Sequence, residues 1–208
     1  MRVARVMAAM AIVVAVAGCA GMHRQPLKAM IARPGVLSHG ETLEYLGVDF
    51  SHCVFFDQYF TYDDVAKSKV PNWSRHTLDD VSAKFPMPLD PDLTVSDKQN
   101  AKITESAFKI LAPGPGQLAL NDAIVHGEIA PYVNKKNSGH GLLFVAEQVS
   151  KPIGVVAHYV IFDRKTGEII LLDQATEEAG GFGIFQYYLS GLKAVAARAQ
   201  KEISALVP

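Results

Sequence analysis

The sequence predicts an α/β fold, in which helices pack on one mixed β-sheet that ends in an antiparallel meander; an α+β arrangement is the alternative. Apolar, strand-like runs alternate with helical patterns through the first half of the chain. Residues 139–172 hold three apolar runs separated by short turns, which favours neighbouring antiparallel strands. Residues 184–206 form a long amphipathic pattern that suits a helix lying on a sheet.

The elements of the first half are less regular. Residues 45–56 are apolar almost throughout and predict a strand covered on both faces. Residues 57–73 mix aromatic and acidic side chains without a period, so we expect a loop with at most a helical turn. Residues 77–84 predict a short helix with Thr77 as its N-cap. The Pro-rich residues 86–100 predict a surface connection.

The second half has clearer patterns. A short strand is predicted at 102–111 and a helix at 117–133, separated by a Pro-Gly-Pro-Gly turn. Residues 139–148 have the most apolar strand core of the chain. Residues 155–162 and 168–172 flank a turn that ends in glycine, which is the pattern of a hairpin.

The N-terminal residues predict a secretory signal. Arg2 and Arg5 precede an apolar run from Val6 to Ala17, which ends in small residues. A membrane-spanning anchor needs roughly 20 apolar residues, and this run is shorter. We therefore divide the chain into a signal peptide at 1–18, a tether at 19–40 and one α/β domain at 41–208.

The stretch Val16-Ala17-Gly18-Cys19 resembles the lipobox of bacterial lipoproteins. An ordinary secretory signal would need no cysteine at this place. The resemblance implies cleavage before Cys19 and attachment of a diacylglycerol and acyl chains such as palmitate, which hold the protein to a membrane. Ala20 stands where an Asp would retain such a protein in the inner membrane, so the resemblance implies the periplasmic face of the outer membrane.

Charge and motif content exclude several classes of function. The signal holds two of the 20 basic residues and none of the 21 acidic ones, so the remaining chain has a formal charge of −3 with His neutral. Nucleic-acid binding needs a basic face, which argues against a nucleic-acid partner. Because no complete catalytic, cofactor or metal-ligand motif is present, we expect no cofactor and no metal.

Cys53 is the one thiol left after lipidation of Cys19. It lies in the apolar run 45–56, so we expect it to be buried and unreactive. His52 is its neighbour, but adjacent residues of a strand point to opposite faces, which argues against a Cys–His nucleophile.

Short pieces between residues 45 and 195 resemble an uncharacterised family of secreted bacterial α/β proteins, many of which carry lipoprotein signals. The pieces are Val48–Ser51, Asn72-Trp73, Gly139–Glu147, Lys151, Val160–Asp163 with Thr166, Gly180–Gly183 and Tyr187-Tyr188. Members usually have Tyr-Trp where this chain has Tyr187-Tyr188. The family has no agreed activity, so the resemblance implies a fold and no catalytic residues. The hairpin and last helix are also similar to periplasmic lipoprotein domains of export and envelope-assembly machines.

Glu147 and His158 form one candidate site, together with the turn made by Gly180, Gly181 and Gly183. If strands 139–148 and 155–162 turn about residue 152, Glu147 faces Ala157 or His158. The pair then either fixes the strand register or lines a pocket. The glycines either let the chain turn into the last helix or cradle an anion.

Four aromatic residues, Tyr59, Phe60, Tyr62 and Trp73, form a second candidate site, because they lie in a region without a period. They are either core residues or an exposed patch for a partner.

These observations favour a lipid-anchored accessory or scaffold protein of the cell envelope that binds another envelope protein and has no enzymatic activity. The alternative is a ligand-binding or hydrolytic lipoprotein with a pocket near Glu147, His158 and the Gly180–Gly183 turn.

We expect the Cys19→Ser protein to carry no lipid, because only the thiol accepts the diacylglycerol. Metabolic labelling with a radioactive fatty acid, followed by immunoprecipitation, measures this. Label on the Ser variant equal to that on the wild type would contradict lipidation at Cys19.

Overall fold

Eight strands form one mixed sheet in the computed structural model, which describes residues 31–57, 60–109 and 122–208. The strand order is β1-β8-β7-β6-β2-β4, and β3 pairs with β6 and β5. The strands are β1 Ile31–Ala32, β2 Leu43–Asp49, β3 Val54–Phe56, β4 Leu89–Pro91, β5 Phe108–Lys109, β6 His140–Ser150, β7 Gly154–Asp163 and β8 Ile169–Glu177.

β6 is the strand on which the two halves of the sheet meet. Its first half pairs in parallel with β2, and its last three residues pair in parallel with β3. On its other side β6 pairs antiparallel with β7, and β7 pairs antiparallel with β8. The predicted mixed sheet with a C-terminal antiparallel meander is therefore confirmed.

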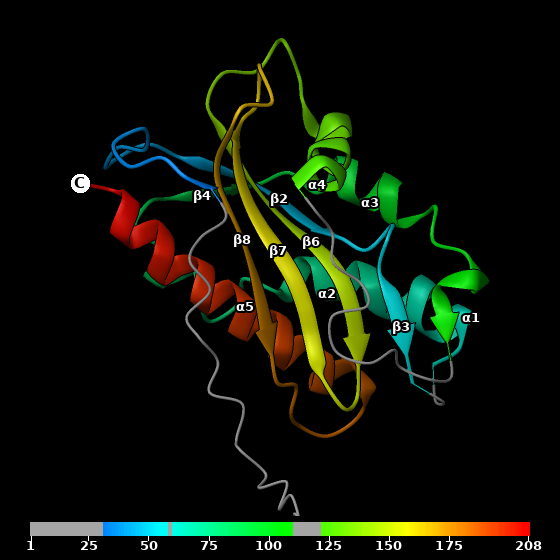
Figure 1. The fold of residues 1–208 in the computed structure, drawn as a ribbon. Helices are drawn as coiled ribbons and strands as arrows, with labels where there is room; N and C mark the ends of the chain where they lie inside the picture. Colours follow the sequence, from blue (N-terminus) through cyan, green and yellow to red (C-terminus); the bar gives the residue numbers. More distant parts are fainter. Residues whose placement is uncertain (1–30, 58–59, 110–121) are drawn as a thin grey trace, which may run out of the picture.

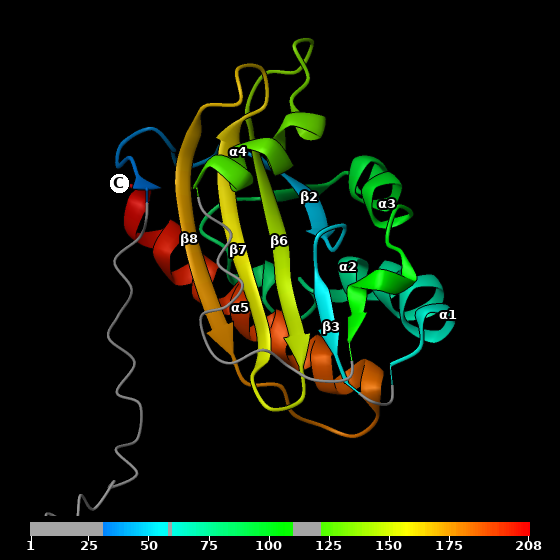
Figure 2. The same ribbon diagram turned by 45° about the vertical axis from the view of Figure 1, so that its right-hand side comes forward.

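Helices cover both faces of this sheet (Figures 1 and 2). α5 Ile184–Leu206 and α2 Val70–His76 lie on one face, and α4 Asp122–Ile129 lies on the other. The remaining helical segments are α1 Tyr62–Asp64, a π-helical turn Val65–Lys69, α3 Thr94–Asn100 and 3₁₀ turns at Ser82–Lys84, Glu105–Ala107 and Ala130–Tyr132.

The two helical layers enclose two apolar clusters. Phe144 and Leu192 belong to the larger one, beneath α5 and α2. Leu143, Val160 and Ile129 belong to the smaller one, beneath α4. Covering on both faces explains why the strands of the meander are apolar at nearly every position.

The predicted strand 45–56 is two strands. The chain turns between β2 and β3, where the N–H of Cys53 donates to the carbonyl of Phe50 at 3.0 Å. Asn100 of α3 fills the break: its side chain accepts from the N–H of Phe50 at 2.7 Å and donates to the carbonyl of Val48 at 2.9 Å. A side chain 50 residues away thus replaces the ladder hydrogen bonds that the turn removes.

The predicted loop 57–73 and the predicted helix 77–84 are both wrong. Residues 62–76 are helical, and Thr77 ends α2 instead of beginning a helix: its hydroxyl donates to the carbonyl of Trp73 at 2.6 Å. Asp80 has φ 70°, a left-handed conformation that interrupts any helix through 77–84. A single 3₁₀ turn at Ser82–Lys84 remains.

Other boundaries shift less. The predicted connection 86–100 contains β4 and α3, and the predicted strand 102–111 is reduced to β5 among its described residues. α4 begins at Asp122, and residues 117–121 of its predicted range lie outside the described residues. β8 continues five residues past its predicted end at Leu172. α5 has its predicted bounds.

The described part of the predicted tether, residues 31–40, packs on the domain. Ile31 and Ala32 form β1, which pairs antiparallel with Leu172 and Leu171 of β8. Leu37 is buried in the larger cluster. Among the residues that the structure describes, no helix combines the length and apolar composition needed to cross a membrane.

Gly154 begins β7 with φ +93°, and a Cβ at this position would clash with the backbone carbonyl of Glu177. We expect Gly154→Ala to lower the free energy of unfolding by about 2 kcal/mol or more, since it combines a left-handed conformation with a backbone clash. Urea denaturation measures the loss. Gly180→Ala is the matched control, because a Cβ there meets no atom within 4 Å; equal losses in the two variants would contradict this account.

Candidate functional site

Glu147, His158 and Gln174 form a hydrogen-bonded group on the sheet. The Nε2 atom of His158 lies 3.2 Å from Oε2 of Glu147, and Nε2 of Gln174 donates to the same carboxylate oxygen at 2.7 Å. His158 is 1 % exposed and Glu147 is 4 % exposed. The predicted contact between Glu147 and His158 is confirmed.

Glu147 lies at a β-bulge of β6. Ala146 pairs with Ala157 and Gln148 pairs with Val156, so Glu147 is the extra residue of β6. His158 faces Gln174 across the next ladder. The pairing agrees with the predicted turn about residue 152. Val145 faces His158 directly, so alternation along β6 puts Glu147, two residues later, on the same face as the imidazole.

Two groups face the same nitrogen of the imidazole: Nε2 of His158 lies 3.2 Å from the Glu147 carboxylate and 3.2 Å from the side-chain nitrogen of Gln174. The Nδ1 atom of His158 is buried without a hydrogen-bond partner among the described residues. An imidazole oriented by a carboxylate is the geometry of a general base, but at 1 % exposure this one has no direct access to a substrate in solution.

The glycine turn lies away from this group. Gly181 and Gly183 line a pocket of about 260 Å³ together with Asp57, Lys151, Ile184, Tyr187 and Tyr188. Neither Glu147 nor His158 lines this pocket. Gly181 has φ 114° and Gly183 has φ 76°, which supports the interpretation that the glycines turn the chain into α5. Gly180 donates its N–H to Ser190 at 2.8 Å.

The four candidate aromatic residues do not form one exposed patch. Trp73 is fully buried, and its Nε1–H donates to the carbonyl of Phe185 at 2.9 Å. Phe60 is buried against Tyr188, with ring centroids 5.1 Å apart. Trp73 and Phe60 are therefore core residues, because α2 and the segment before it turn them toward α5. Tyr62 is half-buried, and Tyr59 lies outside the described residues.

Tyr62 instead borders a groove between the α1–α2 segment and α3. The Nζ atom of Lys67 lies 5.4 Å from the centroid of the Tyr62 ring. Arg75 reaches Asp97 across the groove at 3.5 Å. The cavity has a volume of about 510 Å³, and its lining consists of Tyr62, Ala66, Lys67, Pro71, Arg75, Asp97, Asn100, Ala101 and Ile103.

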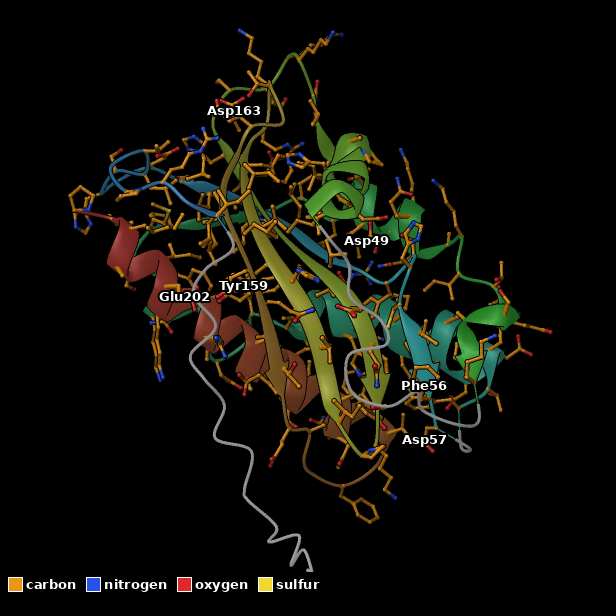
Figure 3. All side chains as sticks on the ribbon, in the orientation of Figure 1. Asp49, Phe56, Asp57, Tyr159, Asp163 and Glu202 are labelled. Atoms are coloured by element: carbon orange, nitrogen blue, oxygen red, sulfur yellow. The ribbon has the colours of Figure 1, made fainter. Side chains whose placement is uncertain are left out.

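A second buried polar group, which sequence reasoning missed, lies beneath α5. The hydroxyl of Tyr159 donates to Oδ2 of Asp173 at 3.0 Å, and both residues are fully buried. Glu202 approaches Tyr159 from α5 (Figure 3). Burial raises the pKa of Glu202, and the nearby Asp173 raises it further. The only signal in the sequence was Asp173 itself, an acid inside an apolar strand.

A third polar group joins α4 to the end of β2. The hydroxyl of Tyr132 donates to Asp49 at 2.7 Å, and His52 lies 3.2 Å from Glu128. Burial raises the pKa of Glu128, while the charge of His52 opposes that rise. Cys53, close by, is buried as predicted, and burial raises the pKa of its thiol. Within the described ranges, no three His, Cys, Asp or Glu side chains are grouped so as to hold a metal ion.

Comparison with known proteins gives a fold likeness only. No family model matches the chain, and no curated protein matches it. A dodecamer of PelC from Paraburkholderia phytofirmans that carries one leucine-to-methionine substitution aligns with a TM-score of 0.38 and 13 % identity over 86 % of this chain and 96 % of that one. The PelC dodecamer from the same organism aligns with a TM-score of 0.34 and 12 % identity, covering 83 % and 95 %. A likeness of this degree assigns no function to this chain.

We expect His158→Ala to lower the free energy of unfolding by about 1–3 kcal/mol, because it leaves the buried Glu147 carboxylate with one donor fewer. Denaturant melts of His158→Ala, Glu147→Gln and the double variant measure the coupling, expected at about 0.5 kcal/mol or more for residues in contact. The exposed pair His76–Asp79, 2.5 Å apart, is the matched control and should give negligible coupling. Strictly additive effects at 147 and 158 would contradict the contact.

We expect Glu202→Gln to stabilise the protein at neutral pH. A carboxyl whose pKa is raised in the folded state favours folding when protonated, and that contribution is lost as pH rises from 4.5 through the raised pKa. Gln keeps the neutral form at every pH. Urea melts from pH 4 to pH 8 should show the two proteins diverging as pH rises; parallel profiles would contradict a raised pKa.

Proposed function

We propose that this chain is a lipid-anchored accessory or scaffold protein of the bacterial cell envelope. Cys19 holds it to the membrane, at the periplasmic face of the outer membrane, and the domain binds another envelope protein without catalysing a reaction. The lipobox-like stretch at Val16–Cys19 supports the anchor. The groove between the α1–α2 segment and α3 is the observation that supports a binding role.

The groove has the composition of a surface for transient protein contacts. Tyr62 offers an aromatic face, and two cationic groups line the groove: Arg75, which pairs with Asp97, and Lys67, which pairs with Asp63. Tyr and Arg are enriched among residues that dominate binding energy. Because Arg75 and Asp97 meet only at 3.5 Å and both are exposed, a partner segment can exchange this weak pair for its own contacts.

The buried polar groups support binding over catalysis. Glu147 and His158 lie in the interior, and so do Tyr159 and Asp173. Each pair stabilises the sheet from inside, whereas the groove lies at the surface and presents the side chains of Lys67 and Arg75. A segment of another polypeptide with both charged and apolar side chains would match the mixed lining of the groove.

Photo-crosslinking in cells tests this proposal. A benzophenone amino acid placed at Ala66 or Ala101, in the groove, should give a discrete crosslinked protein, and the same probe at the exposed Lys165, in the β7–β8 turn, should not. Arg75→Glu should lower the crosslinked yield roughly tenfold, as expected for a residue that dominates an interface. Identical products from all three positions, or none from the groove, would contradict the proposal.

A further inference from the structure

Residues 179–192 contain no charged side chain, although their first half lies at the surface. Phe182 is 96 % exposed, and Val36, at 45 %, is the one other large apolar residue exposed among the described residues. Glycines stand on both sides of Phe182, so no neighbouring side chain shields its ring. Ile184, Phe185 and Tyr187 follow in the first turn of α5 and are half-buried.

The β6–β7 turn lies beside this loop. The two segments occupy the same end of the molecule in both views (Figures 1 and 2). The hydroxyl of Tyr187 donates to the carbonyl of Lys151 at 3.4 Å, and Lys151 is exposed. We call Lys151, Phe182, Ile184, Phe185 and Tyr187 the apolar tip.

We propose that the apolar tip enters the interfacial layer of the membrane on which the protein is anchored. This inference rests on the proposed lipid anchor at Cys19. Aromatic side chains with a flanking lysine are typical of protein surfaces that enter the headgroup layer, where the rings meet acyl chains and the ammonium stays among phosphates.

The direction of the chain supports a membrane as the occupant. β1 runs antiparallel to β8, with Ile31 beside Leu172 and Ala32 beside Leu171. β8 runs toward the apolar tip, so Ile31 is the end of β1 nearer the tip.

The length of the chain before β1 is sufficient. Twelve residue steps separate Cys19 from Ile31, a reach of up to about 40 Å. From Leu172 to the end of β8 at Glu177 the strand advances about 17 Å toward the tip. A lipid on Cys19 and the ring of Phe182 can therefore lie in one membrane surface.

Tryptophan quenching by brominated lipid tests the proposal. The chain without residues 1–18, which keeps every described residue, is coupled through Cys19 to a maleimide lipid in vesicles of anionic and acyl-brominated phospholipids. Cys53 is buried and its thiol pKa is raised, so coupling occurs at Cys19. Trp73, the single tryptophan, is fully buried and gives a constant background. Phe182→Trp adds a probe at the tip.

We expect brominated vesicles to lower the added emission of Phe182→Trp about twofold or more, because an interfacial ring lies about 5–10 Å into the headgroup–acyl boundary. Val36→Trp is the matched control: it replaces the other exposed apolar residue, in the loop between β1 and β2, and should not be quenched. Equal, negligible quenching of both variants would overturn the proposal.

Two other results would also overturn it. Unquenched Phe182→Trp together with dimers crosslinked through position 182 would assign the tip to a second copy of the chain. Quenching of Val36→Trp as strong as that of Phe182→Trp would mean that the domain has no fixed orientation on the membrane. The lipid is attached chemically here, so neither result depends on lipidation in cells. The lipid anchor itself is tested separately, by the fatty-acid labelling of Cys19→Ser.

Discussion

Burial of the β6–β7–β8 meander on both faces is the constraint on which the rest of the structure depends. A polar group inside such a sheet has no water to bind, so it must find its partner within the protein. His158 and Tyr159 are neighbours on β7 that point to opposite faces. His158 meets Glu147 on one side, and Tyr159 meets Asp173 on the other. Each pair joins β7 to an adjacent strand and thereby fixes its register.

The same constraint uses Glu147, His158, Tyr159 and Asp173 to hold the sheet together. The accessible features of the described residues include the groove between the α1–α2 segment and α3, and the apolar tip around Phe182. A domain held near a membrane by a lipid can use two such surfaces together, one toward the bilayer and one toward a partner.

Sequence patterns predicted the parts of the fold whose stability is local or strongly periodic. The bounds of α5 and the order of the meander follow from apolar spacing along the chain. The break between β2 and β3 does not, because it depends on Asn100 of α3. The burial of Trp73 does not follow from such spacing either, because its indole N–H is satisfied by the carbonyl of Phe185, far away in the sequence. Glu202 could not be identified either, since only the docking of α5 brings it to Tyr159 and Asp173.

Chemical modification of histidine tests most directly the claim that the His158–Glu147 pair is sealed inside the sheet. The folded protein is treated with diethyl pyrocarbonate, and carbethoxylation at each histidine is measured by mass spectrometry. His158 should stay unmodified while the exposed His39 and His76 react, and denaturant should make all three react alike. Modification of His158 in the folded protein at the rate of His39 would contradict a sealed interior and would indicate an open site around the imidazole.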